Sequence, residues 1–149
     1  MIAGTGPLYE ELQEKYKDNE NIKFAGFTDG ETKRDLFLNA KAVIIPSVLY
    51  ENFPMVMIEA FRCGIPVISN AWGAIVGIAT HNQNALLSGT ENDTDDERTE
   101  NILQSVKKFE VDKMLRDKLG NNARQTFLEK MEAEKSIEDL INIYKELIK

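Results

Sequence analysis

Short β-branched runs alternate with helical segments over residues 1–90, and this alternation constrains the fold more than any other feature. Residues 42–45 form a continuous apolar run stopped by a proline, which is typical of a strand buried on both faces. Pro54 begins a helical segment that ends at Gly64, and the apolar pair Val67-Ile68 follows. The apolar side of this helical segment is expected to carry Met55, Ile58 and Phe61. Strands and helices in this order predict βαβ units, and therefore an α/β domain with a parallel sheet and helices on both faces.

The first forty residues follow the same order. Their apolar runs are short, and leucines at helical spacing lie between them. The expected elements are the end of a buried strand at Met1–Ala3, a helix over residues 7–17 with Pro7 in its first turn, a strand over residues 22–25, and a helix from Thr28, capped with Glu31, to about Ala40. Because the first strand looks cut short, we expect a fragment that begins inside a domain.

Residues 91–149 predict a helical tail. An acidic run, Glu91–Glu100, contains Thr94 and Glu97 at capping-box spacing. Within the tail, helix breaks are expected near residues 111–112 and 131–136. Just before the tail, the apolar run at residues 85–87 predicts another strand. An apolar stripe marks the final helix. We expect the whole chain, residues 1–149, to be a single domain.

Composition excludes several classes of function. The formal net charge of −7 disfavours nucleic-acid binding, which needs a basic face. The single cysteine, Cys63, excludes an internal disulfide and a Cys-based zinc site, and the single histidine, His81, excludes a His-rich metal centre. No apolar run approaches the ~20 residues of a membrane helix. Chemistry must then come from carboxylates, hydroxyls, amides and backbone, in a protein we expect to be cytoplasmic.

Two segments are candidates for ligand binding. Gly4-Thr5-Gly6-Pro7 is either a glycine turn that lets strand and helix pack closely or a backbone edge near a nucleotide. Residues 46–60 place Glu51 just before a helix and Glu59 inside it, and the first amides of that helix, near Met55–Met57, can bind an anion. Carboxylates there suit sugar or ribose hydroxyls. The alternative is that Glu51 is a solvated loop residue and Glu59 a surface helix residue, neither of which binds a ligand.

Five short motifs stand in register over residues 2–70: Gly4-x-Gly6-Pro7, Phe24–Phe27, Pro46-Ser47, Tyr50–Pro54 through Glu59-Ala60, and Gly64–Ile68. Together they resemble the C-terminal, donor-binding domain of group 1 (family 4) retaining glycosyltransferases, whose fold is GT-B. The pair Glu51 and Glu59 corresponds to the E-x7-E signature of that class. The resemblance implies a Rossmann-like sheet with a helical C-terminal tail.

The resemblance also implies roles for individual residues. Glu51 would be the catalytic glutamate near the donor sugar, and Glu59 would bind the ribose hydroxyls of a nucleotide-sugar. The other substrate-binding positions would be Asn52, Phe53, Pro54 and Met55 at the sugar hydroxyls, Met55 and Val56 at the diphosphate, Phe27 and Thr28 near the base, and Gly4 and Gly6 at the nucleotide. No metal or other cofactor is expected, because the family needs none in most members.

The chain departs from the family pattern in two places. The family carries a glutamate where Gly77 stands, and a Gly-x-x-Gly turn where this chain has Asn82-Gln83-Asn84, although Asn tolerates positive φ. The family's phosphate-binding arginine and lysine, and its N-terminal acceptor domain, precede the region matched here. Trp72 has two open interpretations, as a core residue or as part of the cleft.

We therefore expect the donor-binding half of an enzyme that transfers a sugar from a nucleoside-diphosphate sugar to a hydroxyl of a carbohydrate or lipid-linked acceptor. The product would belong to polysaccharide, glycolipid or glycoconjugate biosynthesis. The isolated chain would be inactive. An alternative to a purely cytoplasmic protein is one that associates with a membrane through the missing N-terminal domain. The alternative is a non-catalytic nucleotide-sugar-binding or scaffolding paralogue, suggested by Gly77.

Overall fold

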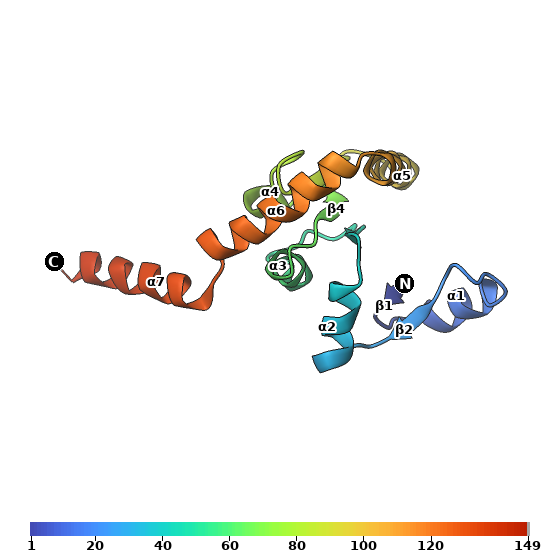
Figure 1. Ribbon diagram of the computed structural model, residues 1–149, viewed down its shortest axis with the longest axis horizontal. Helices are drawn as coiled ribbons and strands as arrows, with labels where there is room; N and C mark the ends of the chain where they lie inside the picture. The colour runs from blue at the N-terminus through green and yellow to red at the C-terminus, as the bar shows by residue number, and fades with distance from the viewer. Residues whose placement is uncertain (149) are drawn as a thin grey trace. The chain divides into compact units, whose positions relative to one another are not determined.

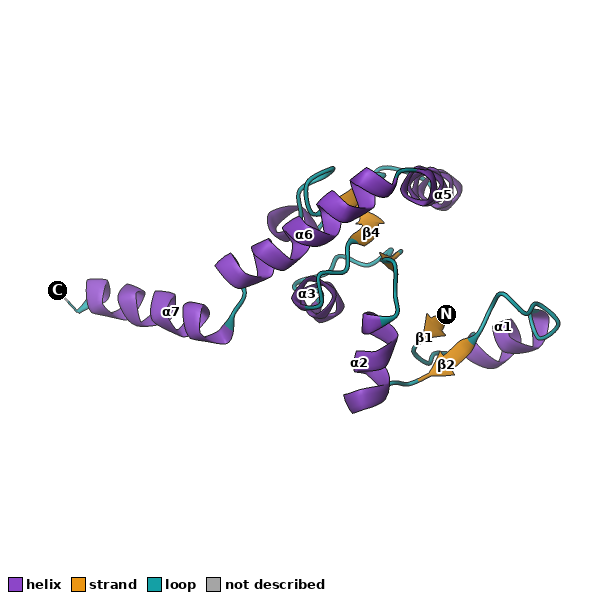
Figure 2. Cartoon of the chain, in the orientation of Figure 1, coloured by secondary structure: helices purple, strands orange, loops and turns teal. Residues whose placement is uncertain are grey.

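The computed structural model describes residues 1–148 and contains two compact units, Met1–Asn39 and the segment from Ala40 onward. Strands and helices alternate through residue 88, and helices follow up to residue 147 (Figures 1 and 2). The elements are β1 (Ile2–Ala3), α1 (Tyr9–Lys15), β2 (Phe24–Gly26), α2 (Gly30–Leu38), β3 (Val43–Ile45), α3 (Met55–Arg62), β4 (Val67–Asn70), α4 (Ile75–Ile78), β5 (Ala85–Ser88), α5 (Asp95–Val111), α6 (Lys113–Lys130) and α7 (Ala133–Leu147). The predicted α/β class is confirmed.

The first unit contains a two-stranded parallel sheet, β1 and β2, connected by α1. The Gly4 amide donates to the Gly26 carbonyl at 2.7 Å, so the two strand ends are tied together. The prediction that the first strand is buried is wrong, because Ile2 is 44% exposed in this small sheet. Pro7 lies in a turn before α1 and not in its first turn.

The capping box predicted at the start of α2 does not form. The N-cap is Asp29, whose backbone is extended and whose side chain makes no capping hydrogen bond. A capping box pairs the N-cap with the residue three positions on. With Asp29 at the N-cap that position is Thr32, so Thr28 and Glu31 are out of register by one residue.

The second unit contains a parallel sheet in the order β3-β4-β5. Successive side chains of a strand point to opposite faces, and all four residues of β4 are buried, so both faces of this strand are covered. Ile68 packs with Leu86, Phe109 and Leu119 in the core under α5 and α6. At the sheet edge, the predicted burial of β3 on both faces is wrong, because Ile44 is 48% exposed.

Helix α3 packs against β3, β4 and α6 (Figure 1). Its buried face is formed by Met57, Ile58, Ala60 and Phe61, whereas Met55, predicted on the apolar side, is 60% exposed. Gly64 ends the helix as predicted, with a φ of +70°. Where α6 crosses this turn, a Cβ at Gly120 would lie 2.8 Å from the Gly64 carbonyl oxygen, so close packing requires glycine there.

The helical tail follows the expected pattern. Thr94 and Glu97 form the predicted capping box of α5, and Asp112 marks the break before α6, where its carboxylate accepts from the Leu115 amide at 2.9 Å. Helix α7 presents its apolar stripe without burying any residue within the described chain. Across residues 1–148 no helix has the length and apolarity needed to span a membrane.

Candidate functional site

The loop between β3 and α3 carries the first candidate glutamate. It begins where β3 ends at Ile45, at the carboxyl end of a parallel strand, where open α/β sheets bind ligands. Glu51 is half-buried on this loop, and the Ser47 hydroxyl donates to its Oε1 at 2.7 Å. The loop therefore holds the carboxylate in a defined direction before any ligand is present.

The start of α3 carries the second glutamate and the candidate anion site. Glu59 is half-buried and lies one turn after Met55, on the same helix face. The expected run of free amides is shorter than predicted, because the Met57 amide donates to the Pro54 carbonyl at 2.9 Å. The amides of Met55 and Val56 precede the first bonds of the helix and remain oriented outward for an acceptor.

The remaining predicted residues of this stretch surround the helix start. Asn52 and Phe53 are exposed, whereas Pro54 is buried and is the N-cap of α3. Apolar side chains also project from the loop, among them Leu49 at 74% and Tyr50 at 71% exposure. The second unit thus brings Glu51, Glu59 and the helix amides together in one continuous segment.

The other predicted residues lie in the first unit. Gly4, with a φ of +115°, and Gly6 follow β1, and a Cβ on either would meet no atom within 4 Å. Phe27, which is 75% exposed, and Thr28 follow β2. These four residues therefore gather at the carboxyl ends of β1 and β2, which the Gly4 to Gly26 hydrogen bond holds together.

Two buried side chains support the Glu51 loop, and sequence reasoning missed one of them, Asn70. Asn70, which is 1% exposed, donates from Nδ2 to the Ser47 carbonyl at 3.1 Å. Trp72 is 5% exposed and donates from Nε1 to the Leu49 carbonyl at 3.1 Å, which settles it as a buried residue. A polar Ser69-Asn70 pair at the end of a buried apolar run was the available signal, since buried polar groups need partners.

Two departures from the family pattern have defined surroundings. Asn82 has a φ of +59°, so it takes the left-handed conformation expected where a glycine was replaced. Gly77 lies in α4 and is exposed, and a Cβ at this position would meet no atom within 4 Å. The space for a longer side chain at residue 77 is therefore present.

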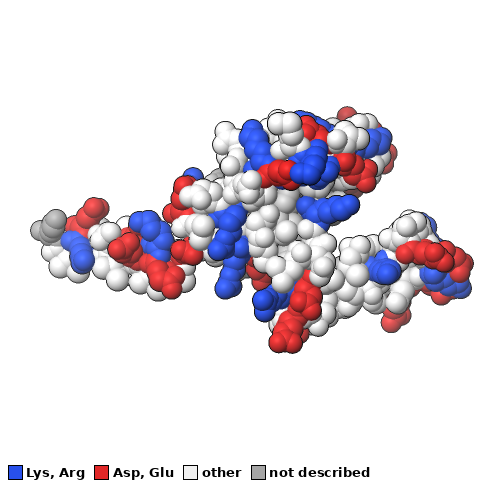
Figure 3. Space-filling model, in the orientation of Figure 1, with Lys and Arg blue, Asp and Glu red and all other residues white. Residues whose placement is uncertain are grey.

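The charge of the candidate site is one-sided. Residues 46–61 and 70–80 contain the two glutamates and no lysine or arginine. On the face drawn in Figure 3, basic and acidic side chains are interspersed over the helices. An anion at the start of α3 would thus depend on backbone amides for its stabilisation.

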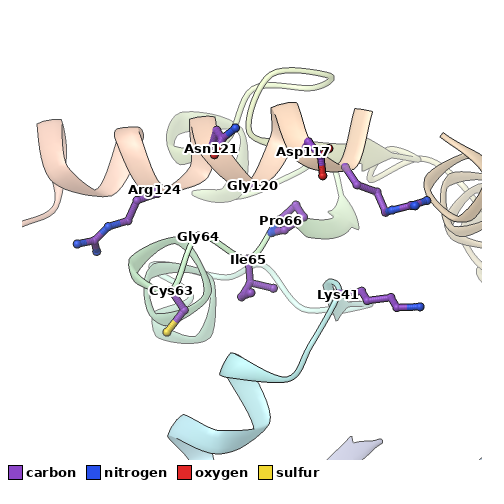
Figure 4. A pocket seen from close by; sticks show the side chains of 10 residues that line it. Lys41, Cys63, Gly64, Ile65, Pro66, Asp117, Gly120, Asn121 and Arg124 are labelled. Carbon is purple, nitrogen blue, oxygen red and sulfur yellow. The ribbon is translucent and has the colours of Figure 1, made fainter. Parts of the chain in front are cut away.

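A hollow of about 660 Å³ lies elsewhere in the second unit. It is formed by residues that precede β3 and β4, such as Lys41 and Pro66, and by the facing side of α6. Figure 4 shows the Lys41 and Arg124 side chains directed to opposite sides. Arg124 and Arg116 donate to carbonyl groups at the ends of α3 and α5. This hollow is at the amino ends of the strands and does not include the candidate glutamates.

These features define an α/β protein of the GT-B glycosyltransferase fold. The chain belongs to the family of glycosyl transferases group 1, whose model matches residues 1–126. The family resemblance read from the motifs is therefore confirmed.

Individual relatives agree with this assignment. An uncharacterized glycosyltransferase of Methanocaldococcus jannaschii is 29% identical over 97% of this chain and 36% of its own length. O-antigen chain mannosyltransferase C of Escherichia coli is 27% identical over 99% of this chain and 39% of its own length. The structure of Anabaena Alr3699/HepE in complex with UDP and glucose superposes with a TM-score of 0.75 at 18% identity, covering 97% of this chain and 39% of that one. The chain thus spans well under half the length of these relatives.

Proposed function

We propose that this chain is the donor-binding half of a retaining glycosyltransferase. The longer enzyme would transfer a sugar from a nucleoside-diphosphate sugar to an acceptor hydroxyl, in the synthesis of a polysaccharide, glycolipid or glycoconjugate. A bond forms between the acceptor oxygen and the anomeric carbon, and the bond from that carbon to the diphosphate oxygen breaks. The bonding electrons and the hydroxyl proton leave with the nucleoside diphosphate. The observation that carries the proposal is the continuous segment from Glu51 to Glu59, which joins two carboxylates to two outward-facing helix amides.

Each part of this segment has a role that suits its chemistry. The Met55 and Val56 amides would stabilise the diphosphate, whose negative charge grows as the sugar leaves. Glu59, on the same helix face as Met55, would accept hydrogen bonds from the ribose hydroxyls. Glu51 would face the donor sugar. Phe27 and Thr28 would lie near the base, and the exposed Gly4 and Gly6 would let a nucleotide approach the backbone.

The proposed enzyme is longer than this chain, as its relatives are. A preceding domain would bind the acceptor and contribute cations to the diphosphate, since residues 46–61 and 70–80 contain no lysine or arginine. UDP bound to the Anabaena protein supports a nucleotide-sugar donor. In keeping with the family resemblance, we propose a reaction without a metal cofactor.

The two glutamates give the sharpest test, in the full-length enzyme. Glu59→Gln keeps the shape of the side chain but replaces a charged acceptor with a neutral one. Affinity for the free nucleotide should fall about fivefold, which corresponds to about 1 kcal/mol. Glu51→Gln should leave the free-nucleotide affinity unchanged and lower kcat at least about tenfold, because it faces the sugar. Calorimetry with UDP and GDP, and nucleotide release from their sugar conjugates, measure both effects.

The matched control is Glu110→Gln, which makes the same change of charge on an exposed residue of α5. It should change neither quantity. If Glu51→Gln weakened the free nucleotide more than Glu59→Gln did, the two roles would be reversed. If neither glutamate affected binding or turnover, the proposal would lose its main support.

A non-catalytic binding protein is the competing candidate, because Gly77 stands where the family carries a glutamate. Nucleotide-sugar binding by the full-length protein without any turnover would favour it. Turnover that depends on Glu51 would exclude it.

A further inference from the structure

The Glu51 loop runs alongside a second loop that follows β4. Three carbonyls of the first loop, those of Ser47, Leu49 and Glu51, each accept a hydrogen bond from the last residue of β4 or from the loop after it. The donors are the Asn70 side chain, the Trp72 indole and the Ala74 amide, at 3.1, 3.1 and 3.0 Å. Each donor lies 23 residues after its acceptor, so the two loops pair in a constant register.

This loop pairing extends the sheet. In the strands, Val43 pairs with Val67 and Ile45 with Ser69, in parallel. Beyond the strands the same two segments stay together, but side chains replace two of the backbone donors. The parallel sheet therefore continues, in altered form, up to the residue that carries the candidate catalytic carboxylate.

The residues that form the pairing are themselves fixed. Asn70 is 1% and Trp72 is 5% exposed. The Arg98 guanidinium of α5 stacks on the Trp72 ring at 4.8 Å. Gly73 has a φ of +60°, and a Cβ there would lie 2.9 Å from the Glu51 carbonyl oxygen. The second loop is thus anchored in the core on one side and touches the Glu51 backbone on the other.

The side chain of Glu51 is held as well as its backbone. The Ser47 hydroxyl donates to Oε1 at 2.7 Å, and the Ser47 carbonyl is the first acceptor of the loop pairing. Oε2 takes no part in that bond. Ser47 therefore connects the sheet to the carboxylate and holds one of its two equivalent oxygens.

We propose that Ser47 is a positioning residue for the Glu51 carboxylate, and that the Asn70 and Trp72 side chains hold Ser47 and its loop in place. This inference rests on the proposed function. A defined carboxylate direction matters because a displacement of about 1 Å at a reacting group costs about 100-fold in rate. Ser47 itself need not touch the substrate.

Ser47→Ala removes the hydroxyl and tests the proposal in the full-length enzyme. Nucleotide release from UDP-glucose and GDP-mannose, with water or an added sugar as acceptor, reports kcat. It should fall about tenfold, while the donor KM and the affinity for free UDP or GDP stay within about twofold. Ser47→Thr keeps a hydroxyl and should recover most of the activity. Ser88→Ala is the matched control. Ser88 is the last residue of β5, and its hydroxyl has no hydrogen-bond partner within residues 1–148.

Combining variants separates positioning from stability. If Ser47 acts through Glu51, then Ser47→Ala should cost little in a Glu51→Gln background, because the carboxylate it orients is already gone. A merely structural serine would cost the same in both backgrounds. Trp72→Phe keeps a buried ring and removes the hydrogen-bond donor to the Leu49 carbonyl. It should lower kcat, as Ser47→Ala does, although the Ser47 side chain is unchanged.

The outcomes divide cleanly. Wild-type kcat in Ser47→Ala overturns the positioning role of Ser47 while the proposed function stands, provided that Glu51→Gln is impaired. Wild-type kcat in Trp72→Phe overturns the supporting role of Trp72. A fully additive loss in the double variant also overturns it. Wild-type kcat in Glu51→Gln overturns the role of Glu51 in the proposed function, and the positioning proposal with it.

Discussion

Gly73 shows how much a single residue determines the candidate site. Alanine at this position would have to adopt a φ of +60° and would place its Cβ 2.9 Å from the Glu51 carbonyl oxygen, which is backbone and cannot move freely. Gly73→Ala should therefore destabilise the full-length protein by about 1–3 kcal/mol and displace the Glu51 loop. Urea unfolding measures the first effect, and nucleotide release from a sugar donor measures the second.

Gly77→Ala is the natural comparison, because the same substitution there meets open space in α4. It should leave stability unchanged or raise it, by up to about 1 kcal/mol. Equal losses in the two variants would show that the close contact at Gly73 is unimportant.

Individual residues also show where sequence reasoning stops. Asn82 stands where the family resemblance places a glycine turn, and it adopts the positive φ that Asn tolerates better than most residues. Met55 was placed on the wrong face, since an apolar residue in the first turn of a helix fits the periodicity whether or not anything covers it. The contact from Asn70 to Ser47 joins residues 23 positions apart, so the local sequence can indicate that Asn70 needs a partner but not which residue that partner is.

The N-terminus of α5 gives a prediction at the scale of an element. The Thr94 backbone amide and hydroxyl both donate to the Glu97 carboxylate, and they lower the pKa of Glu97 below its ordinary 4.5. A carboxyl whose pKa is lowered by folding stabilises the protein above its unfolded-state pKa, and that contribution is lost as the pH falls through the folded-state pKa. Thr94→Ala should cost about 1 kcal/mol at neutral pH and less below 4.5.

Thr99→Ala provides the control in the same helix, because the Thr99 hydroxyl donates to the Asp95 carbonyl one turn earlier and does not cap the helix. It should change stability by less than about 0.5 kcal/mol at either pH. Chemical unfolding of the full-length protein at neutral pH and near pH 3.5 compares the variants. A pH-independent cost for Thr94→Ala would contradict a charged capping box.

Of the two predicted capping boxes, one forms and one does not, and the position at which each helix starts explains the difference. Both Thr28/Glu31 and Thr94/Glu97 have the required spacing, yet only the second forms. Helix α5 begins right after its threonine, whereas α2 begins at Gly30, which moves the N-cap to Asp29. A spacing rule identifies candidate caps, but the register of the helix start decides between them.

At the scale of the whole molecule, the alternation of strands and helices was predictable, because the spacing of apolar residues and the glycines and prolines that end elements are local features of the sequence. The parallel pairing of β3, β4 and β5 followed from it, since strands joined through helices pair in parallel. Burial was harder to predict. Ile2 and Ile44 lie in strands as expected but remain exposed, because burial depends on what lies on each face of a sheet and not on the strand itself.

The absence of cations from the segments around Glu51 and Glu59 gives the last prediction, for the isolated chain. A nucleoside diphosphate would be bound there by amides and carboxylates, without the arginine and lysine expected from a preceding region. A hydrogen bond to a charged group contributes about 1.5–3 kcal/mol, so the loss of two costs about two to four decades of affinity. We expect millimolar binding of UDP or GDP by NMR titration, with shifts centred on the amides of Met55 and Val56. We expect no sugar transfer from a radiolabelled donor, because acceptor positioning and water exclusion need a second domain. A dispersed spectrum checks that the isolated chain is folded. Micromolar binding would contradict the claim that the phosphate-binding cations come from a preceding region. Measurable sugar transfer would contradict the claim that this chain holds only half of the active site.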